Sequence, residues 1–253
     1  MKELEALATK APASLTPQVL LETGLADGYV TKPGPAEGMF VAFNERGISA
    51  VQLGTDAAAF EDWFHGAMGR PAFAVADMPA TLERRFDAAV AKGRVGTLPI
   101  DWSSMSEFQQ LVLRKTAEIL PGQVRPYSWV AREIGRPKAA RAVGTALARN
   151  PVPVVLPCHR VVRNDGHIGN YAFGPEVKRS ILEHEGMDVG GFEAMADRGV
   201  RLTGSNTTKI FCNPTCSDAR RTTARHTVEF HSEDDARQAG YRPCKHCRPA
   251  AAA

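Results

Sequence analysis

The sequence of 253 residues lacks any run of about 18 apolar residues, which is the length that a membrane-spanning helix requires. It has five cysteines, an odd number, and none precedes Cys158. This pattern argues against a secreted disulfide framework and for a reducing compartment, here the bacterial cytoplasm or nucleoid. The first residues, Met1–Leu7, are charged and helix-prone, unlike a signal peptide. We therefore expect a cytoplasmic protein with no membrane association, and a monomer.

The net charge of +3 is distributed unevenly. Residues 1–100 carry nine basic and twelve acidic side chains, residues 101–187 carry twelve and eight, and residues 188–253 carry ten and eight. The positive excess therefore lies in the two segments that contain cysteine. Because phosphate neutralisation dominates nucleic-acid affinity, this distribution suits a polyanionic partner, although ordinary solvated surfaces show a similar excess.

The length suits two domains or three small ones. In the first segment, residues 1–100, two apolar runs within residues 39–53 predict a β-hairpin with Gly47 in its turn. Helical patterns follow at residues 56–64 and 80–92. This segment is interpreted as an N-terminal extension and an α/β supporting domain without chemistry of its own.

The second segment, residues 101–187, begins with an amphipathic helical pattern over residues 106–120. Two short helices, residues 127–134 and 138–148, follow with a Gly-Arg-Pro turn between them, which is typical of a helix-turn-helix. Small side chains on the second helix would let its backbone approach a nucleic-acid groove closely. They are Ala139, Ala140, Ala142, Gly144, Ala146 and Ala148.

A thiol, an imidazole and a guanidinium follow one another at Cys158, His159 and Arg160, where a strand-like apolar run stops at Pro157. Neighbouring basic groups make the reactive thiolate available, so Cys158 is interpreted as a nucleophile rather than a buried structural thiol. Adjacent side chains of an extended segment point to opposite faces, so we expect a water molecule to bridge Cys158 and His159.

Several separated motifs recur in order here: Pro137–Pro151, Pro157-Cys-His-Arg-Val161, Gly169-Asn-Tyr171 and Lys178–Gly186. The stretch from about Phe108 to Gly186 resembles the O6-alkylguanine-DNA alkyltransferases. The resemblance implies that the protein flips an alkylated guanine out of double-stranded DNA and transfers its alkyl group to Cys158. The thioether product is stable, so each molecule would act once.

The resemblance also assigns roles to individual residues. Glu185 matches the glutamate that orients His159 in a Cys–water–His–Glu relay, and Asn150 matches the asparagine that braces the active-site turn. Arg141 matches the arginine that enters the base stack, and Tyr127 matches the tyrosine that presses on the 3′ phosphate of the target. Without the resemblance, Glu185 reads as a helix-end carboxylate, Arg141 as a solvated charge and Tyr127 as a core aromatic.

DNA contact is predicted for several further residues, namely Ala139 and Ala140 in the minor groove, Arg160 and Asn170. The resemblance places pocket contacts at the Val161 backbone and the segment 170–173. Phe173 departs from the family, which often has a small residue there, so the range of alkyl groups accepted stays open.

The third segment, residues 198–250, contains four cysteines in two close pairs: Cys212, Cys216, Cys244 and Cys247. Two such pairs, 27 residues apart, predict one tetrahedral zinc ion with four thiolate ligands. This segment resembles the zinc-binding domain of the Ada type, which takes methyl groups from DNA methylphosphotriesters. The resemblance makes Cys212 the acceptor. Lys209 and Asn213 differ from the commonest family residues, so a purely structural zinc module remains an alternative.

Around the cysteines, we expect basic residues to neutralise the zinc site and to hold phosphates: Arg220, Arg221, Arg225, Arg242, Lys245 and Arg248. Residues 187–204 are expected to form a tether. The predicted fold is α/β plus mostly α, with an α/β supporting domain, a winged-helix-like helix-turn-helix domain and a small α+β zinc domain. The predicted function is single-turnover DNA repair. The alternatives are a non-catalytic binder of lesion DNA and a methylation-sensing regulator.

Overall fold

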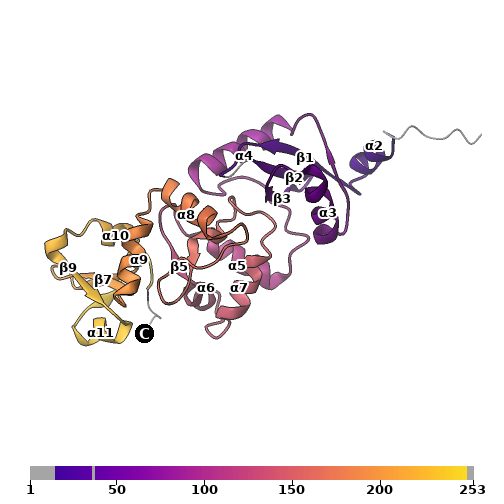
Figure 1. Cartoon of the computed structure of the whole chain (residues 1–253). Helices are drawn as coiled ribbons and strands as arrows, with labels where there is room; N and C mark the ends of the chain where they lie inside the picture. Colours follow the sequence, from indigo (N-terminus) through magenta and orange to yellow (C-terminus); the bar gives the residue numbers. More distant parts are fainter. Residues whose placement is uncertain (1–14, 36–37, 250–253) are drawn as a thin grey trace, which may run out of the picture. The chain divides into compact units, whose positions relative to one another are not determined.

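The computed structural model describes residues 15–35 and 38–249 (Figure 1). The N-terminal stretch Met1–Leu7, expected to be helix-prone, lies outside these residues. The chain forms two compact units: the first contains the residues up to 86 together with 97–104, and the second contains residues 87–96 and those from 105 onward. None of the helices in the described part of the chain has the length and apolar character needed to span a bilayer.

The first unit is built on a four-stranded sheet in the order β3-β2-β1-β4, in which β1 and β4 are parallel and the other pairs antiparallel. The expected β-hairpin is confirmed as β2 and β3. Helix α3 begins where the Asp56 side chain accepts the Ala59 N–H, and its Phe60 and Phe64 pack on the sheet with Tyr29 and Phe40. The elements up to residue 92 are α2 (Leu15–Glu22), β1 (Asp27–Lys32), β2 (Met39–Asn44), β3 (Gly47–Leu53), α3 (Ala57–Met68), β4 (Ala72–Ala74) and α4 (Ala80–Lys92), whose last residues, 87–92, belong to the second unit.

The second unit begins with the predicted helices, which are α5 (Glu107–Thr116), α6 (Tyr127–Glu133) and α7 (Ala140–Ala148). They pack against one another. Strand β5 (Arg125–Pro126) pairs in parallel with β6 (Val161–Val162). Tyr127 directly follows β5, and only His159 and Arg160 separate Cys158 from β6. This short pair of strands therefore brings the two distant motifs to one place.

The segment 187–204 is not the tether that was expected. It contains α9 (Val189–Asp197) and the start of β7 (Leu202–Ser205). Met187, Val189 and Phe192 pack in one buried cluster with residues of the preceding segment, namely Val124, Val162, Ile168 and Leu182. The apolar faces of these residues are therefore covered by the preceding domain, which leaves no free linker.

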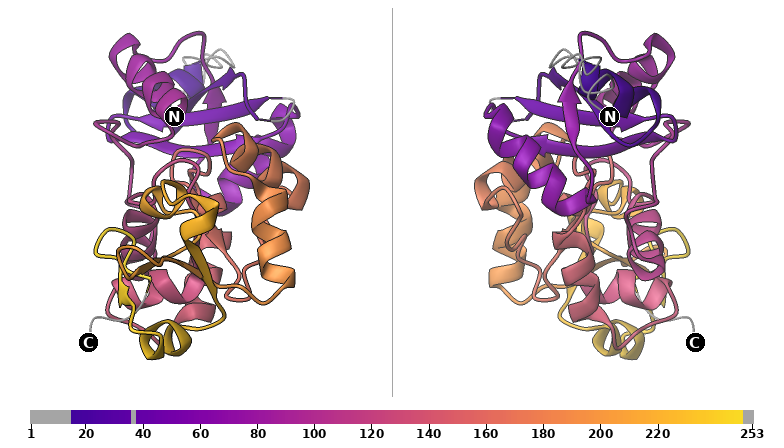
Figure 2. Two further views of the ribbon diagram at one scale, coloured as in Figure 1. Left: turned by 90° about the vertical axis from the view of Figure 1, so that its left-hand side faces the viewer. Right: turned by 90° about the vertical axis from the view of Figure 1, so that its right-hand side faces the viewer.

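The zinc-type segment forms a second sheet, in the order β10-β8-β7-β9. In both views of Figure 2 this yellow segment lies beside the pink helices of the same unit. The remaining elements are α8 (Pro175–His184), β8 (Ile210–Cys212), α10 (Ser217–Arg220), β9 (Thr227–Phe230), α11 (Glu233–Gln238), β10 (Arg242–Pro243) and the 3-10 turns η1 (Cys158–Arg160) and η2 (Ala224–His226).

Candidate active site and metal centre

The segment before Cys158 is a series of turns, not the strand-like run that was expected, and Cys158–Arg160 forms a 3-10 turn. Asn150 braces this segment: its Nδ2 donates to the Leu156 carbonyl at 2.8 Å and to Cys158 Sγ at 3.2 Å, and its Oδ1 accepts the Val152 N–H. Cys158 is 8% exposed, and burial raises the pKa of its thiol. A base is therefore needed to ionise it.

His159 Nε2 lies 3.0 Å from Glu185 Oε1. Burial would raise the pKa of Glu185, but the hydrogen bonds and charges of His159 and Arg160 outweigh it and lower the pKa to about 2. An ionised carboxylate only accepts, so Nε2 carries the proton and Nδ1 is left as a bare acceptor. Nδ1 is buried and has no hydrogen-bond partner among the described residues, and burial lowers the pKa of His159. The neutral ring can thus accept a proton through Nδ1.

Arg160, which was expected to contact DNA, is buried beside the relay instead of exposed. Its side chain is 1% exposed, and its guanidinium is bound to the Glu185 carboxylate and to the carbonyls of Ile119 and Gly93. A buried guanidinium needs such partners because an unpaired one would be expensive to desolvate. A Cβ at Gly93 would come within 2.7 Å of Arg160, so the close approach depends on glycine. Arg160 is the counter-ion of the relay glutamate.

Lys178 and Tyr171 also belong to the surroundings of Cys158. Tyr171 lies in the segment 170–173, where pocket contacts were expected, whereas no role was expected for Lys178. Lys178 Nζ donates to the carbonyls of Val161 at 2.7 Å and Ile168 at 2.6 Å, and burial lowers its pKa to about 8. The Tyr171 ring stands edge-on to His159 at 6.4 Å. The sequence contained an indication that Lys178 is buried, because Lys178 shares a helix face with the apolar Ile181 and Leu182.

The other predicted DNA contacts lie on or near the helix-turn-helix. Arg141 is exposed on α7, Ala139 and Ala140 are half-buried at its start, and Tyr127 is half-buried at the start of α6. A Cβ at Gly144 would lie 3.8 Å from the Tyr127 ring, so α7 passes close to that ring. Asn170 is exposed, and the nearby Phe173 packs on Tyr171.

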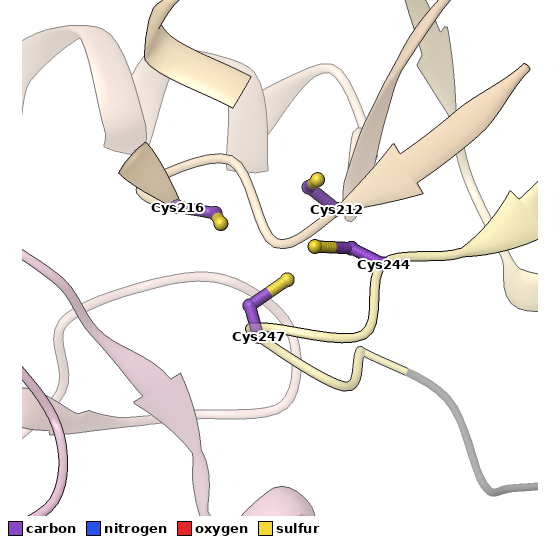
Figure 3. Close-up of side chains that lie close together, drawn as sticks. All are labelled: Cys212, Cys216, Cys244 and Cys247. Atoms are coloured by element: carbon purple, nitrogen blue, oxygen red, sulfur yellow. The ribbon is translucent and has the colours of Figure 1, made fainter. Parts of the chain in front are cut away.

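The four C-terminal cysteines converge from separate elements (Figure 3). Cys212 ends β8, Cys216 precedes α10, and Cys244 and Cys247 follow β10, which is parallel to β8. All four are buried, and their sulfurs lie within 4.8 Å of one another. A tetrahedral zinc with Zn–S bonds of about 2.3 Å separates its sulfurs by about 3.8 Å, so the cluster fits one zinc ion with four cysteine ligands.

Of these four cysteines, Cys212 lines a cavity of about 480 Å³. Its other walls carry hydroxyl and basic side chains, among them Thr208, Thr223, Arg221 and His226. The cavity therefore offers hydrogen-bond donors and a cation beside one sulfur. Arg248, expected to hold phosphates, is exposed and ion-paired with Glu133 at 2.7 Å. The other basic side chains of this set are exposed as well: Arg220, Arg221, Arg225, Arg242 and Lys245.

Comparison with known families supports both parts. The family described as "6-O-methylguanine DNA methyltransferase, DNA binding domain" matches residues 107–187, and "Metal binding domain of Ada" matches residues 194–250. A methylated-DNA–protein-cysteine methyltransferase of Mus musculus is 36% identical over 194 residues, 70% of this chain and 88% of the mouse protein. The Escherichia coli bifunctional transcriptional activator/DNA repair enzyme Ada is 37% identical over 154 residues, 57% of this chain but 41% of Ada.

Two solved structures resemble part of this chain in fold. Mycobacterium tuberculosis OGT in complex with DNA superposes with a TM-score of 0.50 and 26% identity, covering 62% of this chain and 92% of that one. The O6-methylguanine-DNA methyltransferase of Pyrococcus kodakaraensis has a TM-score of 0.51 at 22% identity, covering 64% and 99%, which supports the mixed α/β fold.

Proposed function

Since this chain belongs to the methylated-DNA–protein-cysteine methyltransferase family, we propose that Cys158 accepts the alkyl group of O6-alkylguanine in double-stranded DNA. The observation that carries the assignment is the buried arrangement of Cys158, His159 and Glu185. In it, a neutral imidazole keeps one nitrogen free while the other is fixed by an ionised carboxylate. This is the arrangement that a base for a buried thiol requires.

The transfer is a nucleophilic displacement. The Cys158 proton passes through a bridging water to His159 Nδ1, and Glu185 stabilises the imidazolium that results. The thiolate attacks the alkyl carbon, a carbon–sulfur bond forms, and the bond from that carbon to guanine O6 breaks. The guanine leaves as an anion that takes up a proton. The thioether has no route back to the thiol, so the protein is consumed in a single turnover.

The base must leave the stack before it can reach a buried thiol, because O6 lies inside a stacked pair. We assign the helix-turn-helix of α6 and α7 to this step, with the small side chains Ala139 and Ala140 facing the minor groove. Exposed Arg141 fills the gap in the stack. Tyr127, whose ring lies next to Gly144, presses on the phosphate of the target nucleotide, and Asn170 borders the pocket.

The experiment that tests this proposal is mass spectrometry of the full chain after incubation with duplex DNA containing O6-methylguanine. The wild-type protein should gain one methyl group, on the peptide with Cys158. The variant Cys158→Ser should gain none from the base. If that variant removed the methyl group from guanine to the same extent, another residue would be the acceptor.

Cys212 is proposed as a second acceptor, which takes a methyl group from a DNA methylphosphotriester. The carbon–sulfur bond forms, the carbon–oxygen bond breaks, and a phosphodiester anion leaves. The cavity that Cys212 lines, with Arg221 beside it, supports this assignment. Zinc, when bound by the four cysteines, keeps their sulfurs deprotonated and still nucleophilic at neutral pH. A structural module or a methylation-sensing switch is the alternative role. We further propose that the protein acts as a monomer in the bacterial cytoplasm.

A further inference from the structure

The loop of residues 121–125 touches the catalytic relay on one side. The backbone N–H of Gly122 donates to Glu185 Oε2 at 3.1 Å. Gly122 has a φ of +69°, and a Cβ there would come within 2.8 Å of the Glu185 carbonyl oxygen. The loop therefore packs closely on the relay glutamate, and its position affects how the carboxylate is held.

The same loop is held on its other side by the zinc module. The Thr215 hydroxyl accepts the Val124 N–H at 2.9 Å and donates to the Val124 carbonyl at 3.3 Å. Thr215 is 7% exposed and stands next to the ligand Cys216. One buried hydroxyl thus satisfies both backbone groups of Val124, and its place is fixed by the cysteine cluster.

The backbone at the second cysteine pair accepts hydrogen bonds from the helix that begins at Tyr127. The Trp129 indole N–H donates to the Cys247 carbonyl at 2.9 Å, and the Arg132 guanidinium donates to the Arg248 carbonyl at 2.8 Å. Both donors belong to α6, which begins at Tyr127. The zinc module therefore contacts both the loop and the start of the helix-turn-helix.

Arg125 adds a charge relationship. Its side chain is 5% exposed and its Nε has no partner, while its two terminal nitrogens donate to the Val124 carbonyl and to Gln123. Within the described ranges, no carboxylate forms an ion pair with it. Burial lowers the pKa of Arg125, and negative charge on the four nearby cysteines opposes this effect. The guanidinium also lies over the Trp129 ring, 5.7 Å from its centroid.

We infer that the zinc module is a positioning element for the chemistry at Cys158. The knuckle of residues 212–216 fixes the loop 121–125 through Thr215, and that loop fixes Glu185 and precedes Tyr127. The two acceptor sites are therefore mechanically coupled, although each has its own nucleophile. The inference rests on the proposed role of Cys158 and adds the zinc module to the parts that this role requires.

The test compares Thr215→Val, which keeps the shape of the side chain and removes its hydroxyl, with Thr215→Ser, which keeps the hydroxyl. Thr116→Val is the matched control, because the buried Thr116 hydroxyl donates within α5 to Val112 and joins no other element. Two rates are measured on the full chain: methyl uptake by Cys158 from O6-methylguanine duplex, and labelling of Cys158 by iodoacetamide, both by peptide mass spectrometry. Zinc content is measured in parallel.

Thr215→Val should retain one zinc per chain and react about three- to tenfold more slowly at Cys158, as the loss of one or two buried hydrogen bonds would predict. Thr215→Ser and Thr116→Val should stay close to wild type. If Thr215→Val reacts at the wild-type rate with zinc bound, the inference is wrong. Should that variant lose zinc, Trp129→Phe serves in its place, with the same expected loss and the same contrary result.

The iodoacetamide measurement separates this inference from the proposed function. A wild-type protein that takes no methyl group from the duplex would refute the function of Cys158. The labelling of Cys158 by iodoacetamide would still test the coupling in that case, because slower labelling of Thr215→Val than of wild type would support it. Equal labelling of wild type and Thr215→Val would contradict the coupling even if wild type repaired DNA.

Discussion

Arg160 and Glu185 form a buried ion pair in which Arg160 Nε lies 3.0 Å from each carboxylate oxygen. The same carboxylate orients His159, so one acidic side chain connects a structural cation with the base of the reaction. Two consecutive residues of the Cys-His-Arg motif therefore converge on the end of α8. This arrangement leads to the first two predictions.

Glu185→Gln should slow methyl transfer to Cys158 by about 10²-fold, because the base loses the charge that stabilises its protonated form. Binding to unmodified duplex should stay at the wild-type level, as measured by fluorescence anisotropy. Glu176→Gln, an exposed change at the start of the same helix, is the control. A transfer rate unchanged in Glu185→Gln would remove Glu185 from the relay.

The same carboxylate should make stability depend on pH. The pKa of Glu185 is about 2 in the folded protein against an ordinary value of 4.5, so its contribution is fully present above about pH 5 and is lost as the pH falls toward 2. The size expected is roughly 3 kcal/mol. Urea unfolding should therefore show Glu185→Gln as less stable than wild type at pH 6. The difference should shrink steadily on acidification, and a constant difference would contradict the ion pair.

Arg160→Lys should slow transfer while leaving the salt dependence of DNA binding unchanged, because the guanidinium is buried and touches no phosphate. Anisotropy titrations at several salt concentrations measure the slope. Arg163→Lys is the control, because it makes the same change at an exposed position near the site. A slope reduced by about one would mean that Arg160 reaches DNA after all.

Arg141→Ala should slow repair of O6-methylguanine in duplex DNA by at least about tenfold. The reason is that Arg141, by occupying the gap in the base stack, offsets the few kcal/mol that it costs to extrude the target nucleotide. Attack on free O6-benzylguanine should proceed at nearly the wild-type rate, provided that the pocket beside Phe173 admits this base. Arg84→Ala, an exposed change on α4, should alter neither reaction. Equal loss with both substrates would show a structural role for Arg141.

DNA carrying methylphosphotriesters should methylate Cys212 and none of its three fellow ligands. Peptide mapping by mass spectrometry identifies the cysteine, and Cys212→Ser should take up no methyl group. Methylation changes the formal charge of the zinc site from about −2 to about −1, so affinity for duplex should rise at low salt. A methyl group on another of the four cysteines would show that this other cysteine is the acceptor. If zinc is bound and none of the four cysteines is methylated, a structural module is the better interpretation.

The sequence by itself determined the features whose signals are local. The spacing of Cys212, Cys216, Cys244 and Cys247 was sufficient to predict the zinc site, since each close pair fits one metal knuckle. Two apolar runs on either side of a turn with Gly47 predicted the β2–β3 hairpin, and the helical periodicity predicted α4, α5, α6 and α7, with ends displaced by a few residues. Cys158 was recognisable because its polar neighbours follow it directly.

Tertiary structure alone decided the features that depend on contacts between distant residues. Arg160 looks like a free cation in sequence, and its burial against Glu185 arises only when η1 meets the end of α8. Lys178 lies in the active site because α8 places its Nζ within hydrogen-bond distance of the Val161 carbonyl in β6. Residues 187–204 form a packed helix and the start of a strand, not a tether, because Val124, Val162, Ile168 and Leu182 cover their apolar side chains. The hydrogen bonds between Thr215 and Val124 join residues 91 positions apart, a distance at which no local pattern of propensity or spacing carries information.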